Sequence, residues 1–235
     1  MLLKTFLIFF AVILTNPVYS KDEAGHSAHH KAEHARVKGE INPEKSLLLL
    51  KNGNKRYTTA HTRRDGFGNR DRKKLVSGQK PYAIVLSCSD SRVPPEIVFD
   101  QKLGEIFVIR TAGQALDFSA IASIEYAIEH LGSNLIVVMG HESCGAVKAA
   151  LATLKGGDAG SQWLNKLVAD LHPHLKRFSD LSQTDGVVVE SWANVEGVSK
   201  DLLDRSEIVR KYVESGELTI QKALYRLGSG DVEWR

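Results

Sequence analysis

Cysteine, tryptophan and proline are scarce in this chain, and neither sign of charge dominates. Two cysteines among 235 residues exclude a small scaffold built on many disulfides. Lys and Arg number 31 against 28 Asp and Glu, and the formal net charge of +3 does not by itself indicate a nucleic-acid partner. Hydrophobic residues make up 43% and charged residues 25%, which excludes a disordered, collagen-like or multi-span membrane chain. The sequence therefore predicts one globular domain, with or without an extension.

A long hydrophobic run is also absent, and the apolar stretch at the N-terminus is short. It extends from Phe6 to Leu14 and follows Lys4, the one charged residue among the first twenty. Such a stretch is too short to span a bilayer but is typical of a secretory signal peptide. We expect a signal peptide at residues 1–20 with cleavage after Ser20, a periplasmic or secreted protein, and no stable membrane insertion after cleavage. An uncleaved N-terminal anchor is the alternative.

Residues 21–40 are polar and contain four of the nine histidines. These are His26, His29, His30 and His34. The composition predicts a solvated linker before a folded domain of residues 41–235. A weak scavenging site for zinc or copper is the alternative, but no cysteine or spaced set of carboxylates supports a fixed geometry there.

The folded domain is predicted to begin with a helical arm. Asn42 and Pro43 have the residue types of an N-cap and a first helical position. Four consecutive leucines, Leu47 to Leu50, follow on this helix, and four successive side chains cannot all face one core. Either the helix is buried on several sides, or one face of it packs on another subunit.

Strands and helices alternate in the middle of the chain. Short apolar runs at 82–86, 105–109 and 135–139 are typical of buried parallel strands. A helical stripe lies between the second and third, and Gly132 marks its end. The stripe consists of Ile121, Ile124, Ile128 and Leu131. More helix is expected at 194–214, and a late strand at 218–227, at the sheet edge. The prediction is an α/β fold with a mostly parallel central sheet, flanked by helices and preceded by the helical arm.

Both cysteines directly follow predicted strands. Cys88 comes after the first strand, and His141 and Cys144 come after the third. The carboxyl ends of parallel strands meet at one edge of the sheet, where such folds build their sites. Two thiolates and one imidazole make a good zinc set that leaves a fourth position open. A disulfide between the cysteines is the alternative in an exported protein.

Two short segments resemble the signature motifs of the β-class carbonic anhydrases. They are Cys88-Ser-Asp90-Ser-Arg92 and His141-Glu-Ser-Cys144. The resemblance covers almost all of the chain after the linker. It implies reversible hydration of carbon dioxide to bicarbonate and a proton, with one zinc ion per subunit held by Cys88, His141 and Cys144. It also implies a homodimer or an oligomer built from dimers.

The resemblance assigns roles to two further residues of the first motif. Zinc-bound hydroxide attacks carbon dioxide in this family, the aspartate matching Asp90 accepts a hydrogen bond from the zinc-bound water, and the arginine matching Arg92 holds that carboxylate. In some members this aspartate instead becomes a fourth zinc ligand in a closed state that bicarbonate favours. Here Val85 and Ser87 stand where those members have Trp and Gly. We therefore expect the plant-type arrangement, in which Asp90 pairs with Arg92.

Three residues are expected near the substrate. Gln101 resembles a substrate-binding glutamine of plant-type members, although an exposed loop residue is an equal alternative. Gly113 and Gly145 are small enough to let the backbone approach the pocket. Gln114 stands where the family usually has Asn. Two other functions remain open: hydrolysis of a carbon dioxide analogue such as carbon disulfide, and zinc buffering through the His-rich linker.

Overall fold

The computed structural model of the chain describes residues 36–235. The predicted signal peptide and residues 21–35 of the predicted linker lie outside the described residues. Arg36 and Val37, near the end of that linker, lie against the folded part: the Val37 amide donates to the Glu129 carbonyl at 3.0 Å, and Arg36 Nη2 donates to the Ser133 carbonyl at 3.0 Å. No helix within residues 36–235 combines the length and apolar composition that crossing a membrane requires.

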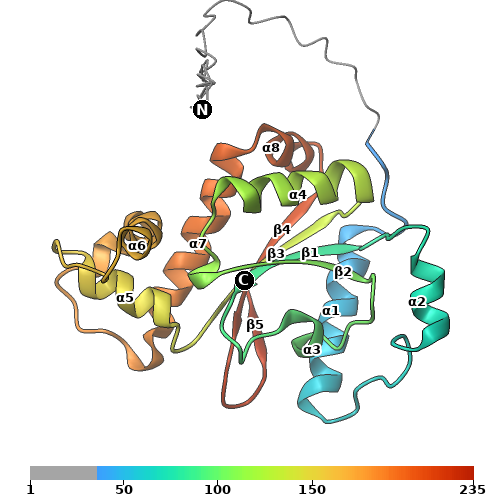
Figure 1. Ribbon diagram of the computed structural model, residues 1–235, viewed down its shortest axis with the longest axis horizontal. Coiled ribbons are helices and arrows are strands. Elements are labelled where there is room, and N and C mark those ends of the chain that lie inside the picture. Colours follow the sequence, from blue (N-terminus) through green and yellow to red (C-terminus); the bar gives the residue numbers. More distant parts are fainter. Residues whose placement is uncertain (1–35) are drawn as a thin grey trace, which may run out of the picture. The chain divides into compact units, whose positions relative to one another are not determined.

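A five-stranded sheet forms the centre of the fold (Figure 1). Its spatial order is β2-β1-β3-β4-β5. The strands are β1 (Ala83–Cys88), β2 (Ile106–Thr111), β3 (Leu135–His141), β4 (Thr219–Tyr225) and β5 (Val232–Trp234). The first four are parallel, and β5 pairs antiparallel with β4. The mostly parallel α/β sheet is confirmed. The prediction that the late strand is an edge strand is wrong, because the chain turns back after β4 and adds β5 outside it.

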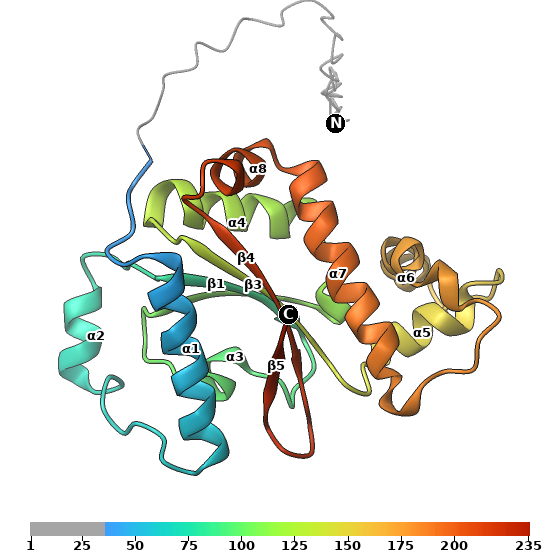
Figure 2. The ribbon, with the colours of Figure 1, turned by 180° about the vertical axis from the view of Figure 1, so that it is seen from behind.

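Helices flank both faces of the sheet (Figures 1 and 2). They are α1 (Pro43–Thr58), α2 (Asn69–Leu75), α3 (Pro95–Val98), α4 (Phe118–Leu131), α5 (Gly145–Thr153), α6 (Gln162–Leu175), α7 (Val188–Arg205) and α8 (Glu207–Glu214). Three short 3-10 turns, η1 (Ala112–Gln114), η2 (Lys176–Phe178) and η3 (Asp185–Val187), join them. The expected helical stripe became α4, which Gly132 ends in the left-handed conformation.

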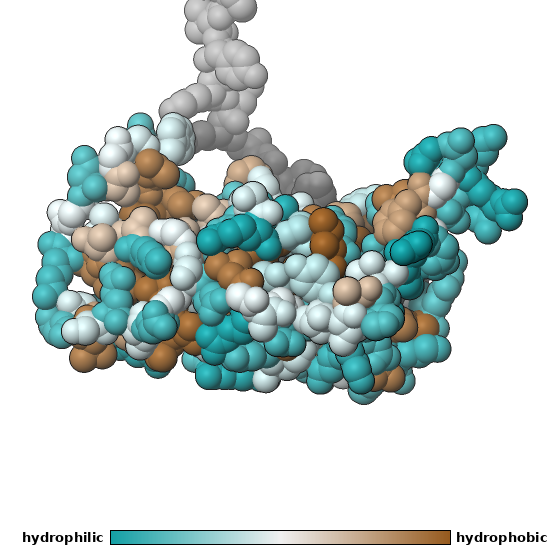
Figure 3. All heavy atoms as spheres, turned by 90° about the horizontal axis from the view of Figure 1, so that it is seen from below, coloured by the Kyte–Doolittle hydropathy of each residue, from teal (hydrophilic) through white to brown (hydrophobic). Residues whose placement is uncertain are grey.

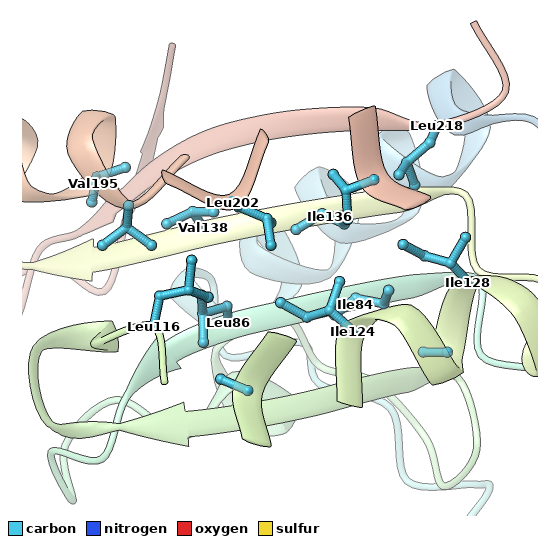
Figure 4. Packing of buried hydrophobic residues seen from close by; sticks show 14 of the residues in the cluster. Ile84, Leu86, Leu116, Ile124, Ile128, Ile136, Val138, Val195, Leu202 and Leu218 are labelled. Carbon is cyan, nitrogen blue, oxygen red and sulfur yellow. The ribbon is translucent and has the colours of Figure 1, made fainter. Parts of the chain in front are cut away.

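Alternate residues of each central strand face different layers of helices. In β1, Ile84 and Leu86 pack with residues of α4 and α7, and Figure 4 shows this layer. Val85, between them, packs on the other face with Leu50 of α1 and with Phe99. Because side chains alternate with period two, burial on both faces requires an unbroken apolar run. This is why β1 and β3 are recognisable in the sequence.

The first helix buries one side and exposes another. The Asn42 side chain accepts a hydrogen bond from the Lys45 amide at 2.9 Å and caps the helix as predicted. Leu50 is fully buried, whereas Leu48 and Leu49 are 55% and 37% exposed. Within the single chain, burial on several sides is therefore ruled out.

Candidate metal centre

Three side chains from the carboxyl edge of the sheet meet in one place. Cys88 is the last residue of β1, His141 is the last residue of β3, and Cys144 is the N-cap of α5. One donor atom from each lies within 4.8 Å of the other two, and all three residues are buried. Both cysteines are free thiols, so they do not form the alternative disulfide. The adjacency of β1 and β3 in the sheet produces this cluster.

The ring of His141 is oriented by its own neighbour. Its Nδ1 lies 2.8 Å from the Glu142 carbonyl oxygen, which can only accept, so Nδ1 carries the proton. The other nitrogen, Nε2, is therefore left with a lone pair. Nε2 is buried and has no hydrogen-bond partner among the described residues. A buried acceptor without a partner is costly, and a metal ion bound by Nε2 would satisfy it.

The pKa values of the two cysteines shift in opposite directions, because a hydrogen bond joins their sulfur atoms. A hydrogen bond from the Cys144 thiol lowers the pKa of Cys88 well below its usual range, although burial opposes this. The same hydrogen bond, together with burial, raises the pKa of Cys144. The Gly113 amide also donates to Cys88 Sγ at 3.3 Å. A thiolate, a second sulfur whose proton a metal would displace, and a free imidazole nitrogen fit a zinc ion, because zinc takes thiolate and neutral imidazole ligands.

Asp90 and Arg92 form an ion pair beside these donors. Arg92 donates from Nε to Asp90 Oδ1 at 2.9 Å and from Nη2 to Oδ2 at 2.7 Å. The side-chain hydrogen bonds from Arg92 hold the pKa of Asp90 well below its usual range. Asp90 Oδ2 lies 3.9 Å from His141 Nε2. The carboxylate therefore stands at the donor cluster as an ionised hydrogen-bond acceptor.

The three residues predicted to lie near the substrate have different surroundings in the structure. Gly113 lies next to the cluster and has a φ of 64°, and a Cβ there would be 2.8 Å from Leu171; both features require glycine. Gly145 follows Cys144 directly, and a Cβ there would meet no atom within 4 Å. Gln101 is buried, and its amide bonds the Tyr82 hydroxyl and the Phe99 carbonyl. It is not an exposed loop residue, and its substrate role stays a prediction.

Sequence reasoning missed two residues that hold the loops of the centre. Arg110 donates to the carbonyls of Cys88 at 3.0 Å and Asp90 at 2.7 Å. The Glu142 carboxylate accepts from the amides of Leu227 at 2.6 Å and Gly228 at 3.2 Å, in the β4–β5 turn. Arg110 directly follows the apolar run at residues 106–109 and is the charged residue of β2, which was the available signal for it. Nothing local in the sequence marks Glu142.

A mostly parallel sheet in an α/β fold gathers two cysteines and a histidine at its carboxyl edge, and this donor set could hold a zinc ion. Known proteins agree with this assignment. The family model described as "Carbonic anhydrase" matches residues 83–232. "Carbonic anhydrase 2" of Mycobacterium tuberculosis is 38% identical over 191 residues, covering 80% of this chain and 91% of that protein. "Carbonic anhydrase" of Mycolicibacterium smegmatis is 38% identical over 196 residues, covering 83% and 94%.

Solved structures give the same result. The chain is similar to a structure described as one of two tetrameric β-carbonic anhydrases from Sordaria macrospora. The TM-score is 0.62 and the identity 25%, with 81% of this chain and 94% of that chain covered. The chain therefore belongs to the β-carbonic anhydrase family, as its motifs predict.

Proposed function

We propose that this protein is a zinc-dependent carbonic anhydrase that reversibly hydrates carbon dioxide to bicarbonate and a proton. Cys88, His141 and Cys144 would hold one zinc ion per subunit. The observation that carries the proposal is the buried cluster of three donor atoms within 4.8 Å, beside a carboxylate that an arginine holds. Storage of zinc needs no such ion pair.

Zinc in this site would act as a Lewis acid and lower the pKa of a water molecule. Two thiolates offset much of the charge of the ion, so the surrounding groups must assist. Asp90 is an acceptor toward the donor cluster, and Arg92 keeps it ionised and fixes its two oxygens. The carboxylate can therefore orient a hydroxyl donor without competing as a donor itself.

Hydration of carbon dioxide by the zinc-loaded protein tests the proposal. We expect turnover to rise in proportion to bound zinc up to one ion per subunit, and deletion of residues 21–35 to leave it unchanged. This deletion keeps Arg36, which contacts the fold. If the protein binds zinc but does not hydrate carbon dioxide, and the deletion abolishes zinc binding, zinc buffering through the His-rich linker would be favoured. Hydrolysis of carbon disulfide without hydration would favour the analogue hydrolase.

Bicarbonate is expected not to inhibit this protein allosterically. The pair between Asp90 and Arg92 keeps the carboxylate directed to the guanidinium, and Val85 supplies no indole for a bicarbonate pocket. A ligand shifts a two-state equilibrium only through differential binding. Hydration rates measured at increasing bicarbonate should show simple product inhibition. Sigmoidal loss of activity, or a crystal structure near neutral pH with Asp90 bonded to zinc, would contradict this.

We further propose a homodimer, or an oligomer of dimers, in which α1 contributes to the interface. Leu48 and Leu49 are exposed in the single chain, and the surface has other hydrophobic patches between hydrophilic ones (Figure 3). The structural relative from Sordaria macrospora is tetrameric. Sedimentation at micromolar concentration should give at least twice the mass of one chain, and Leu48→Glu should lower it. A monomer for the unaltered protein would refute the dimer.

We also propose that the protein is exported and that cleavage occurs after Ser20, on the basis of the short apolar run near its N-terminus. N-terminal sequencing of the protein recovered from the periplasm or medium should begin at Lys21. Recovery of the uncleaved chain with the membranes would support the anchor instead.

A further inference from the structure

A series of hydrogen bonds connects the surface of α7 to a sulfur of the metal centre. Asp201 Oδ2 lies 2.9 Å from His174 Nε2, and His174 Nδ1 lies 2.9 Å from Asn194 Oδ1. Asn194 Nδ2 donates to the Gly113 carbonyl at 2.8 Å. The Gly113 amide then donates to Cys88 Sγ at 3.3 Å. The series links α7, α6, η1 and the end of β1.

The direction of each bond follows from the groups at its ends. The Gly113 carbonyl can only accept, so the amide nitrogen of Asn194 faces it and the amide oxygen faces His174. The Asp201 carboxylate is an acceptor as well. Both ring nitrogens of His174 thus face oxygen acceptors. Asn194 is fully buried, and both polar atoms of its side chain take part in this series.

Helix α7 is shaped to receive the imidazole ring. Asn194, Gly197 and Asp201 are spaced by three and four residues, so they lie on one face of the helix. A Cβ at Gly197 would come within 2.1 Å of Cδ2 and 2.2 Å of Cγ of His174. Glycine is unfavourable in a helix interior, and here it leaves the space that the ring occupies.

The turn that receives these bonds needs support. Gly113 and Gln114 have φ values of 64° and 46°, in the left-handed region that only glycine adopts at low cost. Such a turn persists only where its surroundings hold it. Asn194 holds the carbonyl of the same residue whose amide faces Cys88.

We propose that Asn194 and His174 are positioning residues of the metal centre. They fix the η1 turn so that the Gly113 amide donates to Cys88 Sγ, which stabilises negative charge on this sulfur and directs it toward the metal. This inference rests on the proposed zinc function. Loss of a partner that orients a ligand typically weakens metal affinity about 10- to 100-fold.

Two substitutions in the full mature protein interrupt the series at different points. Asn194→Asp keeps an acceptor for His174 but removes the donor to the Gly113 carbonyl. Gly197→Ala keeps every polar group and displaces the ring. Lys200→Ala is the control, because Lys200 lies on the same helix and is 73% exposed. Asp201→Asn is the conservative variant, because it still offers an acceptor to Nε2.

Zinc affinity by chelator competition and the sulfur-to-cobalt charge-transfer band of the cobalt-loaded protein are the readouts. We expect Asn194→Asp and Gly197→Ala to weaken zinc binding about 10- to 100-fold and to shift the cobalt band. Lys200→Ala and Asp201→Asn should match the unaltered protein. Variants that melt earlier yet keep the unaltered affinity and cobalt band would show a merely structural role and overturn the proposal.

Hydrogen exchange of the Gly113 amide supplies a readout that needs no metal. Exchange of this amide should be faster in Asn194→Asp and in Gly197→Ala than in Lys200→Ala. Equal exchange rates would overturn the proposal. If Asn194→Asp does not fold, Gly197→Ala and Asp201→Leu carry the test, since Asp201 is 38% exposed. Failure of the unaltered protein to bind zinc would instead refute the proposed function, and the exchange rates would still decide whether the series holds the turn.

Discussion

Replacing His141 with alanine is expected to eliminate both zinc binding and carbon dioxide hydration. His141 contributes the one imidazole of the donor set, and its Nε2 is buried without another partner. Two sulfurs alone leave a divalent ion with too few protein ligands for the usual zinc geometry. We expect bound zinc to fall from one per subunit to near zero, and turnover to fall by at least about 10³-fold. Metal analysis and stopped-flow hydration assays measure the two effects.

The control for this substitution is His130→Ala, because His130 is exposed on α4 and is not part of the cluster. It should keep full zinc content and activity. Cys88→Ser and Cys144→Ser should behave like His141→Ala, since each removes a soft thiolate ligand. Any of the three cluster variants that retained one zinc per subunit would show that the donor set has been assigned wrongly.

The sequence predicts that Cys88, His141 and Cys144 come together, and it does so for a physical reason. Cys88 and His141 each end a strand that is buried on both faces, and such strands require continuous apolar runs that are visible without a structure. Parallel neighbours then bring their carboxyl ends together. A residue that directly follows such an apolar run can therefore be placed at the carboxyl edge of the sheet from the sequence alone.

Other parts of the fold depend on contacts that no local pattern records. The β4–β5 hairpin is one: the Asn54 side chain on α1 donates to the Gly230 carbonyl at 2.8 Å and accepts from the Val232 amide at 3.0 Å. These partners are more than 170 residues apart in the chain. Strand β5 has only three residues, too few for a hydrophobic period. The support of Gly113 by Asn194 escapes prediction for the same reason.

Removing either partner of the Asp90–Arg92 pair should reduce turnover more than zinc content. Neither residue belongs to the three-donor cluster, so Asp90→Asn and Arg92→Ala should keep about one zinc per subunit. Loss of a positioned proton acceptor typically lowers a rate by about 10²- to 10⁴-fold, and we expect Asp90→Asn to fall in this range. Arg64→Ala, which alters an exposed arginine, is the matched control and should be active. Parallel loss of zinc and activity would contradict this assignment.

The pH dependence of carbon dioxide hydration by Arg92→Ala tests whether Arg92 keeps Asp90 ionised. Hydrogen bonds from Arg92 lower the pKa of Asp90 in the folded protein. The ionised Asp90 therefore stabilises the fold at every pH above the pKa that Asp90 has in the unfolded chain. This stabilisation is lost as the pH falls through the pKa of Asp90 in the folded protein. Without the guanidinium, the pKa of Asp90 should rise toward about 3.9. Asp90 then takes up its proton at higher pH, and the acid limb of the rate profile should shift upward in pH. Zinc content measured at each pH separates this shift from metal loss. An acid limb in the same place as that of Arg64→Ala would show that Arg92 does not control the ionisation of Asp90.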